Sequence, residues 1–226
     1  MSGPDPAVEL RGVSKTYFGG VPTPVLFDIN LRVMPGEFVA VVGASGSGKT
    51  TLLNIVGLLD STTEGEVWLG GRNVAHLTEL ERAMLRRDYL GFIFQFHYLL
   101  AEFSVIENAL MPCRLRGKQF CDARQEAMED LLRRVGLGDR IQYRPRQLSG
   151  GQQQRVAIIR ALANDPVVIL ADEPTGNLDS ANGRAVFDLM RELNRLTGKA
   201  FLIVTHDESL AREAERVIHI RDGRIE

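Results

Sequence analysis

The chain has 226 residues, enough for one large or two small domains, and we expect it to bury roughly three quarters of its unfolded surface. Its 27 Lys and Arg residues nearly balance 29 Asp and Glu residues, and the formal net charge of −2 gives no reason to expect a nucleic-acid partner. No apolar run approaches the ~20 residues that cross a bilayer, and residues 1–6 lack the basic and apolar regions of a signal peptide, so we expect a cytosolic chain that does not enter a membrane by itself.

The first apolar patterns predict two kinds of strand. Residues 27–34 alternate between apolar and mostly polar side chains, which is typical of a half-exposed strand. Its apolar face consists of Phe27, Ile29, Leu31 and Val33. Together with residues 8–13, this segment predicts an antiparallel layer. After a Pro-Gly turn, residues 38–42 form a continuous apolar run, as expected of a parallel strand that is covered on both faces.

A glycine-rich loop follows this run directly. Its residues fit the phosphate-binding pattern GxxxxGK followed by Ser or Thr; they are Gly43, Ala44, Ser45, Gly46, Ser47, Gly48, Lys49 and Thr50. Such glycines let backbone N–H groups converge on phosphate oxygens, while Lys49 would bridge the terminal phosphates and the Thr50 hydroxyl could hold Mg²⁺. The next segment predicts a helix with an apolar face of Leu52, Ile55, Val56 and Leu59. An ordinary glycine turn is the alternative, but the flanking strand and helix are the context that the phosphate motif requires.

From about residue 96 to residue 146 the patterns are helical. Ser104 and Glu107 form a capping box ahead of one helix, and a second helix is outlined from Asp122 to Gly136. We find no convincing strand here, so the segment predicts a helical insertion. The cysteines, Cys113 and Cys121, have no metal-type spacing and are expected to be reduced thiols.

The stretch Leu148-Ser149-Gly150-Gly151-Gln152 supports two interpretations. It satisfies the S-x-x-Q capping-box pattern ahead of a helical stripe at Val156, Ile159 and Ala163, so Ser149 could simply start a helix. Glycine, however, costs roughly 1 kcal/mol in a helix interior, and less in the first turn, unless something must approach the backbone closely. An anion is the natural candidate. Because one nucleotide needs only one phosphate loop, a second phosphate-contacting element favours a working unit of two chains.

The last patterns complete an α/β core. Residues 167–171 and 201–204 are apolar runs, and between them lies a helical pattern that Gly198 is expected to stop. The first of these strands ends in Asp172 and Glu173, at the carboxyl edge where parallel sheets bind ligands. Asp172 would complete a Mg²⁺ shell and Glu173 could polarise the attacking water. An acidic strand end alone is more often a helix cap or a solvated loop.

These motifs resemble those of the nucleotide-binding subunit of an ATP-binding cassette (ABC) transporter, in the family's order and over essentially the whole chain. The resemblance implies an α/β P-loop NTPase core of the ABC ATPase type, with an antiparallel β subdomain and an inserted α-helical subdomain. It predicts one nucleotide-binding domain over residues 1–226. Residues 1–95 and 147–226 would form the core with its N-terminal antiparallel layer, and residues 96–146 the helical subdomain.

The resemblance also assigns roles to single residues. Tyr17 falls where the family stacks an aromatic ring on adenine, Gln95 where it senses metal and nucleotide, and His206 where it contacts the γ-phosphate. Asp179 lies in the loop that crosses between subunits. Taken singly, each has a commoner structural explanation, as a surface aromatic, a strand-end polar residue, a turn histidine or a helix cap.

The implied site is therefore as follows. Catalysis is assigned to Glu173, His206, Lys49 and Gln95, and Mg²⁺ binding to Thr50, Gln95 and Asp172. ATP is expected to contact Tyr17, Gly43, Ala44, Ser45, Gly46, Ser47, Gly48, Lys49, Thr50, Thr51, Gln95, Asp179 and His206, together with Ser149, Gly151 and Gln152 of a second chain.

A narrower resemblance lies in residues 94–112, which begin Phe-Gln-Phe-His-Tyr-Leu-Leu. This segment is similar to the ATPases of the lipoprotein-releasing group, although Tyr98 and Ala101-Glu102 differ from their usual residues. Residues 171–179 are shared more widely, including with macrolide-export and cell-division relatives. The aromatic residues lie where the family docks its membrane subunit, but they could also be a packed cluster without a partner.

The resemblance implies an ATP-hydrolysing subunit that pairs head to tail with a second copy of itself around two ATP molecules. It would drive separate transmembrane permease subunits from the cytoplasmic side of the bacterial inner membrane, and the narrower resemblance implies that they release lipoproteins. A macrolide- or peptide-type exporter and a cell-division cassette are alternatives within the family, and some cassettes of the division type do not hydrolyse ATP. Soluble ABC proteins that act on DNA or ribosomes usually carry coiled-coil insertions, tandem cassettes or basic tails, which this sequence lacks.

Overall fold

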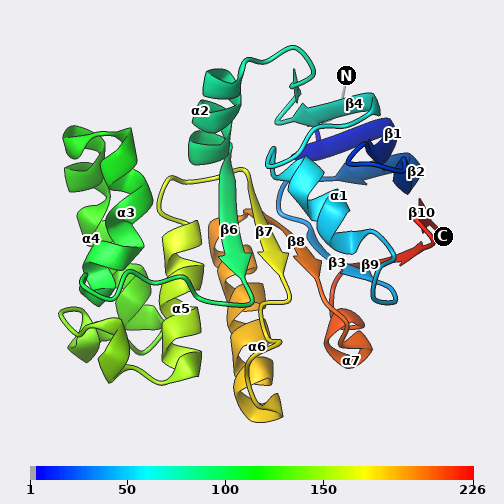
Figure 1. The fold of residues 1–226 in the computed structure, drawn as a ribbon. Coiled ribbons are helices and arrows are strands. Elements are labelled where there is room, and N and C mark those ends of the chain that lie inside the picture. Colours follow the sequence, from blue (N-terminus) through cyan, green and yellow to red (C-terminus); the bar gives the residue numbers. More distant parts are fainter. Residues whose placement is uncertain (1–3) are drawn as a thin grey trace.

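The computed structural model describes residues 4–226; residues 1–3, which belong to the segment interpreted above as lacking signal-peptide character, lie outside the described residues. Two sheets and the helices around them make up the molecule (Figure 1). The larger sheet has six strands in the order β10-β9-β3-β8-β7-β6. Its bounds are β3 Phe38–Val42, β6 Leu90–Phe94, β7 Val168–Asp172, β8 Ala200–Val204, β9 Arg216–Arg221 and β10 Arg224–Ile225.

The predicted parallel strands are confirmed. β3 pairs in parallel with β8 and β9, and β7 pairs in parallel with β6 and β8. Every residue of β3 and β8 is buried. Alternate residues belong to different cores. Phe38 and Phe201 pack with the helices α3 (Val105–Arg116), α5 (Gly150–Ala161) and α6 (Ser180–Thr197), whereas Val39 and Leu202 pack with α1 (Lys49–Val56) and the smaller sheet. The continuous apolar runs thus reflect a sheet covered on both faces.

The smaller sheet is the predicted antiparallel layer, in the order β2-β1-β4-β5. It consists of β1 Val8–Tyr17, β2 Thr23–Val33, β4 Glu64–Leu69 and β5 Arg72–Asn73. The alternation expected from Phe27 to Val33 is wrong at its start. Asp28 has a φ of 48° and the ladder shifts register near it, so Leu26 is buried and Phe27 is only half-buried.

Most helices follow the predicted patterns, with shifted ends. The bounds are α1 Lys49–Val56, α2 Glu79–Tyr89, α5 Gly150–Ala161, α6 Ser180–Thr197 and α7 Glu208–Ala211. α6 ends at Gly198 (φ 65°), as predicted. α1 ends earlier than predicted because the chain turns at Gly57, so Leu59, expected on its apolar face, is 54% exposed. Likewise Ala163 lies beyond the end of α5, although it is buried.

Residues 96–146, all of which the structure describes, contain helices and no strand. α3 spans Val105–Arg116 and α4 spans Lys118–Arg134, followed by the 3₁₀ turns η1 Gly138–Arg140 and η2 Pro145–Gln147. The capping box of Ser104 and Glu107 is confirmed. α4 begins at Lys118 rather than at Asp122, whose carboxylate instead accepts a hydrogen bond from the Lys118 ammonium at 2.6 Å.

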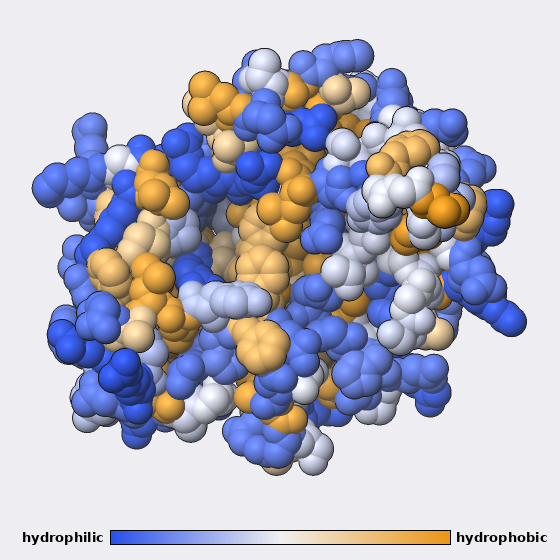
Figure 2. Space-filling model, in the orientation of Figure 1, coloured by the Kyte–Doolittle hydropathy of each residue, from blue (hydrophilic) through white to orange (hydrophobic). Residues whose placement is uncertain are grey.

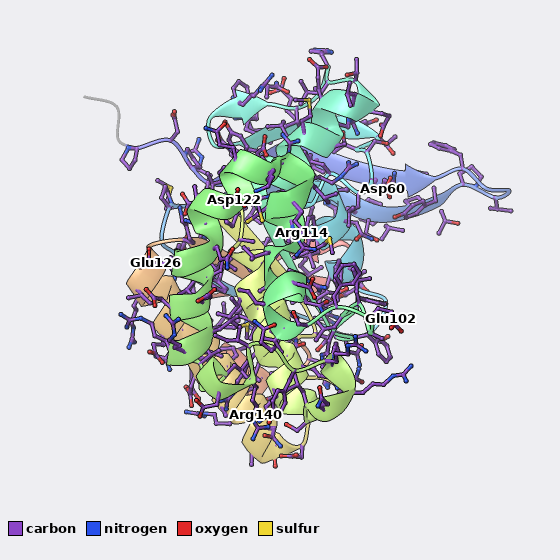
Figure 3. The ribbon with its side chains drawn as sticks, turned by 90° about the vertical axis from the view of Figure 1, so that its left-hand side faces the viewer. Asp60, Glu102, Arg114, Asp122, Glu126 and Arg140 are labelled. Carbon is purple, nitrogen blue, oxygen red and sulfur yellow. The ribbon has the colours of Figure 1, made fainter. Side chains whose placement is uncertain are left out.

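α3 and α4 lie side by side on the outer side of α5, far from α1 (Figure 1). Figure 3 shows this face, with Asp122 and Glu126 on α4 and Arg114 on α3. Within residues 4–226, no helix combines the length and apolar character that a membrane span requires.

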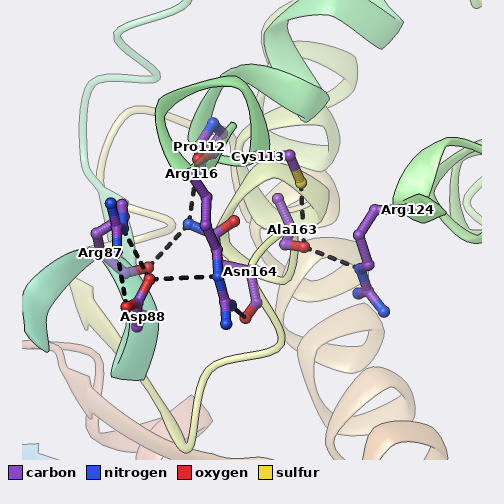
Figure 4. A network of polar contacts seen from close by, with 8 residues as sticks. All are labelled: Arg87, Asp88, Pro112, Cys113, Arg116, Arg124, Ala163 and Asn164. Atoms are coloured by element: carbon purple, nitrogen blue, oxygen red, sulfur yellow. Dashed lines mark hydrogen bonds and ion pairs between the residues drawn. The ribbon is translucent and has the colours of Figure 1, made fainter. Parts of the chain in front are cut away.

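Polar contacts join the helical segment to α2 and to the loop after α5 (Figure 4). The Asn164 carboxamide, in the loop after α5, donates to Arg87 O at 2.8 Å and to Pro112 O at 3.2 Å. Next to it, Ala163 O accepts from Cys113 Sγ at 3.2 Å and from Arg124 Nε at 3.0 Å. Burial raises the pKa of the Cys113 thiol to about 11, so this cysteine is a packed, protonated side chain.

Candidate functional site

The glycine-rich loop leaves β3 at the carboxyl edge of the sheet and leads into α1. Gly46 and Gly48 have φ values of 78° and 105°, and a Cβ on Gly48 would lie 2.7 Å from Leu26 Cδ2. The Lys49 ammonium folds back over the loop and donates to Gly43 O at 2.8 Å and to Ala44 O at 2.9 Å. The buried Ser47 hydroxyl has no hydrogen-bond partner among residues 4–226. The positive φ values of Gly46 and Gly48 and the Lys49 ammonium at the start of α1 suit the binding of an anion.

A hollow of about 430 Å³ opens beside this loop. It brings Glu173 and His206 together with most of the predicted loop, although these come from distant parts of the sequence. Of the predicted loop residues, Gly43, Ala44 and Ser47 do not line it. Its lining consists of Val25, Ser45, Gly46, Gly48, Lys49, Thr50, Thr51, Glu173 and His206.

Glu173 follows β7 in a left-handed conformation with a φ of 46°. Its amide donates to Val204 O at 2.9 Å, and its Oε2 lies 2.8 Å from His206 Nδ1. The turn therefore directs the carboxylate into the hollow, whereas Asp172 remains in the sheet, paired with Phe94 and Val204. The two adjacent acids thus have different environments, and the reason is this left-handed turn after the strand rather than the strand pleat on which the prediction was based.

Asp172 is the carboxylate predicted to bind Mg²⁺, and it is partly buried at the end of β7. Burial and the nearby charge of Glu173 raise the pKa of Asp172, and the Lys49 ammonium acts in the opposite direction. No cluster of three or more His, Cys, Asp or Glu side chains suited to a metal exists within residues 4–226. Mg²⁺ usually needs only one or two protein carboxylates because phosphates and waters complete its shell, so Asp172 with the Thr50 hydroxyl is a suitable donor set.

Gln95 follows β6, which lies beside β7, but it does not line the hollow. Its carboxamide forms a reciprocal pair with Asn177: Gln95 Nε2 donates to Asn177 Oδ1, and Asn177 Nδ2 donates to Gln95 O, both at 3.1 Å. The predicted metal-sensing residue is therefore linked to the loop that precedes α6.

Tyr17, the last residue of β1, lies close to Thr51 of α1. Its hydroxyl donates to Asp60 Oδ2 at 2.8 Å, and the Lys15 ammonium, 2.6 Å from Asp60 Oδ1, lies 4.7 Å from the centre of its ring. Burial and the Asp60 charge raise the pKa of the Tyr17 phenol, and a contact from Thr51 lowers it. Lys15 and Asp60, which the motif search did not identify, hold this ring in place.

The structure contains the capping box at the start of α5. Ser149 Oγ accepts from Gln152 N at 3.4 Å, while Gln152 Oε1 accepts from Ser149 N and from Arg140 Nη1, both at 3.0 Å. None of Ser149, Gly151 and Gln152 belongs to the residues of 4–226 that line the hollow. α5 packs in the core on one face of the sheet and α1 in the core on the other, so one chain does not bring the two predicted phosphate-contacting elements together.

Asp179 is the N-cap of α6. Its Oδ1 accepts from Asn182 N at 2.9 Å and its Oδ2 accepts from Asn182 Nδ2 at 2.6 Å, and these bonds lower the pKa of the carboxyl. The helix-cap interpretation is therefore correct within the chain. A Cβ on Gly151 would lie 3.1 Å from Asn182 Oδ1, which places this cap against the start of α5.

A second hollow, of about 490 Å³, lies next to β6 and is largely apolar. Figure 2 shows apolar surface in the middle of this face, bordered by charged side chains. We call it the β6 groove; its lining is Leu59, Arg86, Arg87, Leu90, Gly91, Phe92, Phe94, Tyr98, Met111, Pro112, Leu115, Arg160, Ala161 and Asn164. Of the segment expected to dock a partner, Phe94, Tyr98, Met111 and Pro112 line this groove.

Comparisons with known proteins agree with this geometry. A family model described as ABC transporter matches residues 26–176. The lipoprotein-releasing system ATP-binding protein LolD of Shewanella denitrificans is 51% identical over 215 residues, which are 95% of this chain and 92% of that protein.

Two solved structures extend the similarity to the fold. A bacterial ABC transporter cassette, solved as a dimer, is 43% identical, with a TM-score of 0.84 over 97% of this chain and 96% of that chain. A dimeric post-hydrolysis state of the same cassette, bound to ADP and Pi, is 42% identical, with a TM-score of 0.82 over the same shares of the two chains.

Proposed function

The chain belongs to the ABC transporter ATPase family, and we propose that it is the ATP-hydrolysing subunit of a membrane complex that releases lipoproteins from the bacterial inner membrane. It would act on the cytoplasmic side of that membrane, held there by transmembrane permease subunits. The substrate class is supported by the 51% identity to a lipoprotein-releasing ATP-binding protein over 95% of this chain.

The observation that carries the proposal is the lining of the 430 Å³ hollow. The phosphate loop, a carboxylate and a histidine meet there at the carboxyl edge of a parallel sheet, where such folds bind their ligands. In this proposal the loop amides and Lys49 hold the phosphates of ATP, and Tyr17 supports the adenine. Mg²⁺, held by Thr50, Asp172 and Gln95, would supply positive charge to the β- and γ-phosphates.

Glu173 and His206 carry the proposed chemistry. Glu173 orients the attacking water and accepts its proton as the new O–P bond forms and the bond between the γ-phosphorus and the bridging oxygen breaks. The contact of 2.8 Å between His206 Nδ1 and Glu173 Oε2 fixes both side chains at the mouth of the hollow. His206 is then available to contact the γ-phosphate. The products are ADP and phosphate.

A second copy of the chain completes the proposed site. Ser149, Gly151 and Gln152 of one copy would cover the ATP held by the loop of the other, which explains why they lie outside the hollow of their own chain. The β6 groove is the proposed docking surface for the permease subunit. Its largely apolar lining suits the apolar face of a partner helix.

The first experiment measures ATP turnover by the purified chain and by Lys49→Ala. We expect turnover in the parent and its loss in the variant, because the ammonium that contacts the phosphates is removed while the loop glycines remain. A parent chain that folds and binds ATP but does not hydrolyse it would contradict the proposal and favour a non-hydrolysing cassette.

The cargo needs a second experiment. The membrane protein that co-purifies with the chain is reconstituted with it in liposomes that contain a fluorescent lipoprotein. ATP-dependent release of that lipoprotein supports the proposal. A complex that hydrolyses ATP but retains the lipoprotein would contradict the proposed cargo and leave the proposed ATPase activity intact.

A further inference from the structure

Gln154 is a polar residue in the core of the molecule. It lies on α5, near the helix start at Ser149, and its side chain is fully buried (0% exposed) beside the apolar residues Val156 and Ile158. A buried carboxamide destabilises a fold unless its donors and acceptor are satisfied. The partners of Gln154 therefore indicate what the residue does.

Those partners lie next to the proposed catalytic residues. Gln154 Nε2 donates to Pro174 O at 2.7 Å and to Phe94 O at 3.3 Å. Pro174 directly follows Glu173 and Phe94 directly precedes Gln95. One side chain of α5 thus holds the backbone on which both the carboxylate and the glutamine depend.

The third partner connects Gln154 to the β6 groove. Gln154 Oε1 lies 2.6 Å from His97 Nδ1. The next residue, Tyr98, lines the groove and has a φ of 45°. Arg160, further along α5, donates to His97 O and Tyr98 O, both at 2.8 Å. α5 therefore holds this irregular segment through two side chains: Gln154 contacts the His97 ring and Arg160 contacts the backbone.

We propose that Gln154 is a positioning residue that fixes Glu173 and Gln95 relative to each other and to the start of α5, and that His97 extends this link to the β6 groove. The inference rests on the proposed function, which assigns the roles of Glu173 and Gln95. The phosphate loop touches none of these bonds, because its helix α1 packs on the other face of the sheet. A loss of Gln154 should therefore affect turnover and spare ATP binding.

The test compares Gln154→Leu with Asn194→Leu. Misplacement of a catalytic group by about 1 Å can cost 100-fold, so for Gln154→Leu we expect kcat to fall at least about tenfold, with KM for ATP within about twofold of the parent. Asn194 is the matched control: its buried carboxamide also donates to two backbone carbonyls, Gly36 O and Lys199 O, both at 2.8 Å. These carbonyls precede the amino ends of β3 and β8, at the edge of the sheet opposite the site, so Asn194→Leu should keep the parent kcat.

Hydrogen exchange without nucleotide gives a readout that general destabilisation would not. In Gln154→Leu, the amides of residues 94–98 and 174–177 should exchange faster, with residues 43–51 unchanged. His97→Leu should loosen residues 96–98 alone, and adding it to Gln154→Leu should cost no further turnover. If Gln154→Leu does not fold, Gln154→Glu keeps the length and the acceptor for His97 but removes the donor, and the same outcomes apply.

A folded Gln154 variant with the parent kcat, or with faster exchange spread over the whole chain, would overturn the inference. So would equal loss of turnover in Asn194→Leu. A parent that hydrolyses no ATP would instead contradict the proposed function, while the exchange measurement would still decide whether Gln154 holds the two segments.

Discussion

Glu173 shows how a single residue is adapted to its place in the site. Its φ of 46° is a conformation that costs a non-glycine residue on the order of 1–3 kcal/mol. The hydrogen bond from its amide to Val204 and the contact of its carboxylate with His206 maintain that turn. Without it the side chain would continue the alternation of β7 and would not face the hollow.

Glu173→Gln tests the proposed role of this carboxylate. The amide keeps the size of the side chain but cannot accept a proton, so we expect ATP binding to persist and turnover to fall about 100-fold or more. The ATP-bound pair of chains should accumulate, which size-exclusion chromatography with ATP detects. Glu192→Gln, on the exposed side of α6, is the control and should turn over ATP at the parent rate. A Glu173→Gln variant with parental turnover would remove Glu173 from this role.

At the scale of single residues, the sequence predicts chemistry better than conformation. The loop from Gly43 to Thr50 is contiguous, so its spacing alone predicts a phosphate site. The contacts of Tyr17 with Lys15 and Asp60 cannot be read in this way, since Asp60 is distant in the chain. Gln154 did carry a signal that was missed: a glutamine within the apolar pattern of α5.

Among the elements, the segment after α5 connects two helices through the side chain of Asn164. Asn164 is 3% exposed and its carboxamide connects the end of α2, through Arg87 O, with α3, through Pro112 O (Figure 4). The Arg87 side chain pairs with Asp88 at 2.7 Å, and Arg116 of α3 approaches the same carboxylate at 3.6 Å. These contacts hold the helical segment against the border of the β6 groove.

Asn164→Ala should therefore destabilise the chain. It leaves two carbonyls without their donor, and loss of partners for buried polar groups lowers the free energy of unfolding by roughly 1–3 kcal/mol. Urea denaturation followed by circular dichroism measures the change. The control is Gln125→Ala, because Gln125 is exposed on α4 and, among the described residues, its side chain bonds only to Glu129 of the same helix. This variant should cost less than about 0.5 kcal/mol. Equal midpoints for the two variants would contradict the role of Asn164.

The sequence predicts whether a segment is a helix or a strand where its apolar pattern is long. It does not predict the residues at which the helices and strands begin and end. α6 and the buried strands β3, β7 and β8 have uninterrupted patterns. α4 begins at Lys118, without a side-chain cap at Gly117, so the sequence held no start signal there and Asp122 was mistaken for one. β4 was not predicted, because only Val67 and Leu69 of its six residues are buried.

For the whole molecule, the decisive feature is the separation of α1 from α5. The two helices begin with the two glycine-containing motifs, yet they pack in different cores on opposite faces of the six-stranded sheet. The sequence predicted two unlike phosphate contacts and hence a pair of chains. The fold supports that inference, because Ser149 does not line the hollow of its own chain.

Mixing two inactive variants tests whether a second chain completes each site. Ser149→Arg places a charged, bulky side chain at the start of α5, and Lys49→Ala removes the phosphate-binding ammonium, so each variant alone should be inactive. In a mixed head-to-tail pair, the intact Lys49 of one chain meets the intact Ser149 of the other. One of the two sites is then complete, and an equal mixture should regain up to about a quarter of the parental turnover if sites act independently. A mixture as inactive as its parts, despite pairs detected by chromatography, would mean that each chain needs both motifs itself or that both sites must be intact for either to turn over.

A mixture of Glu173→Gln with the parent chain separates these two explanations. Each mixed pair then has one intact catalytic carboxylate and both binding surfaces unaltered, so it tests whether one site can turn over beside an inactive one.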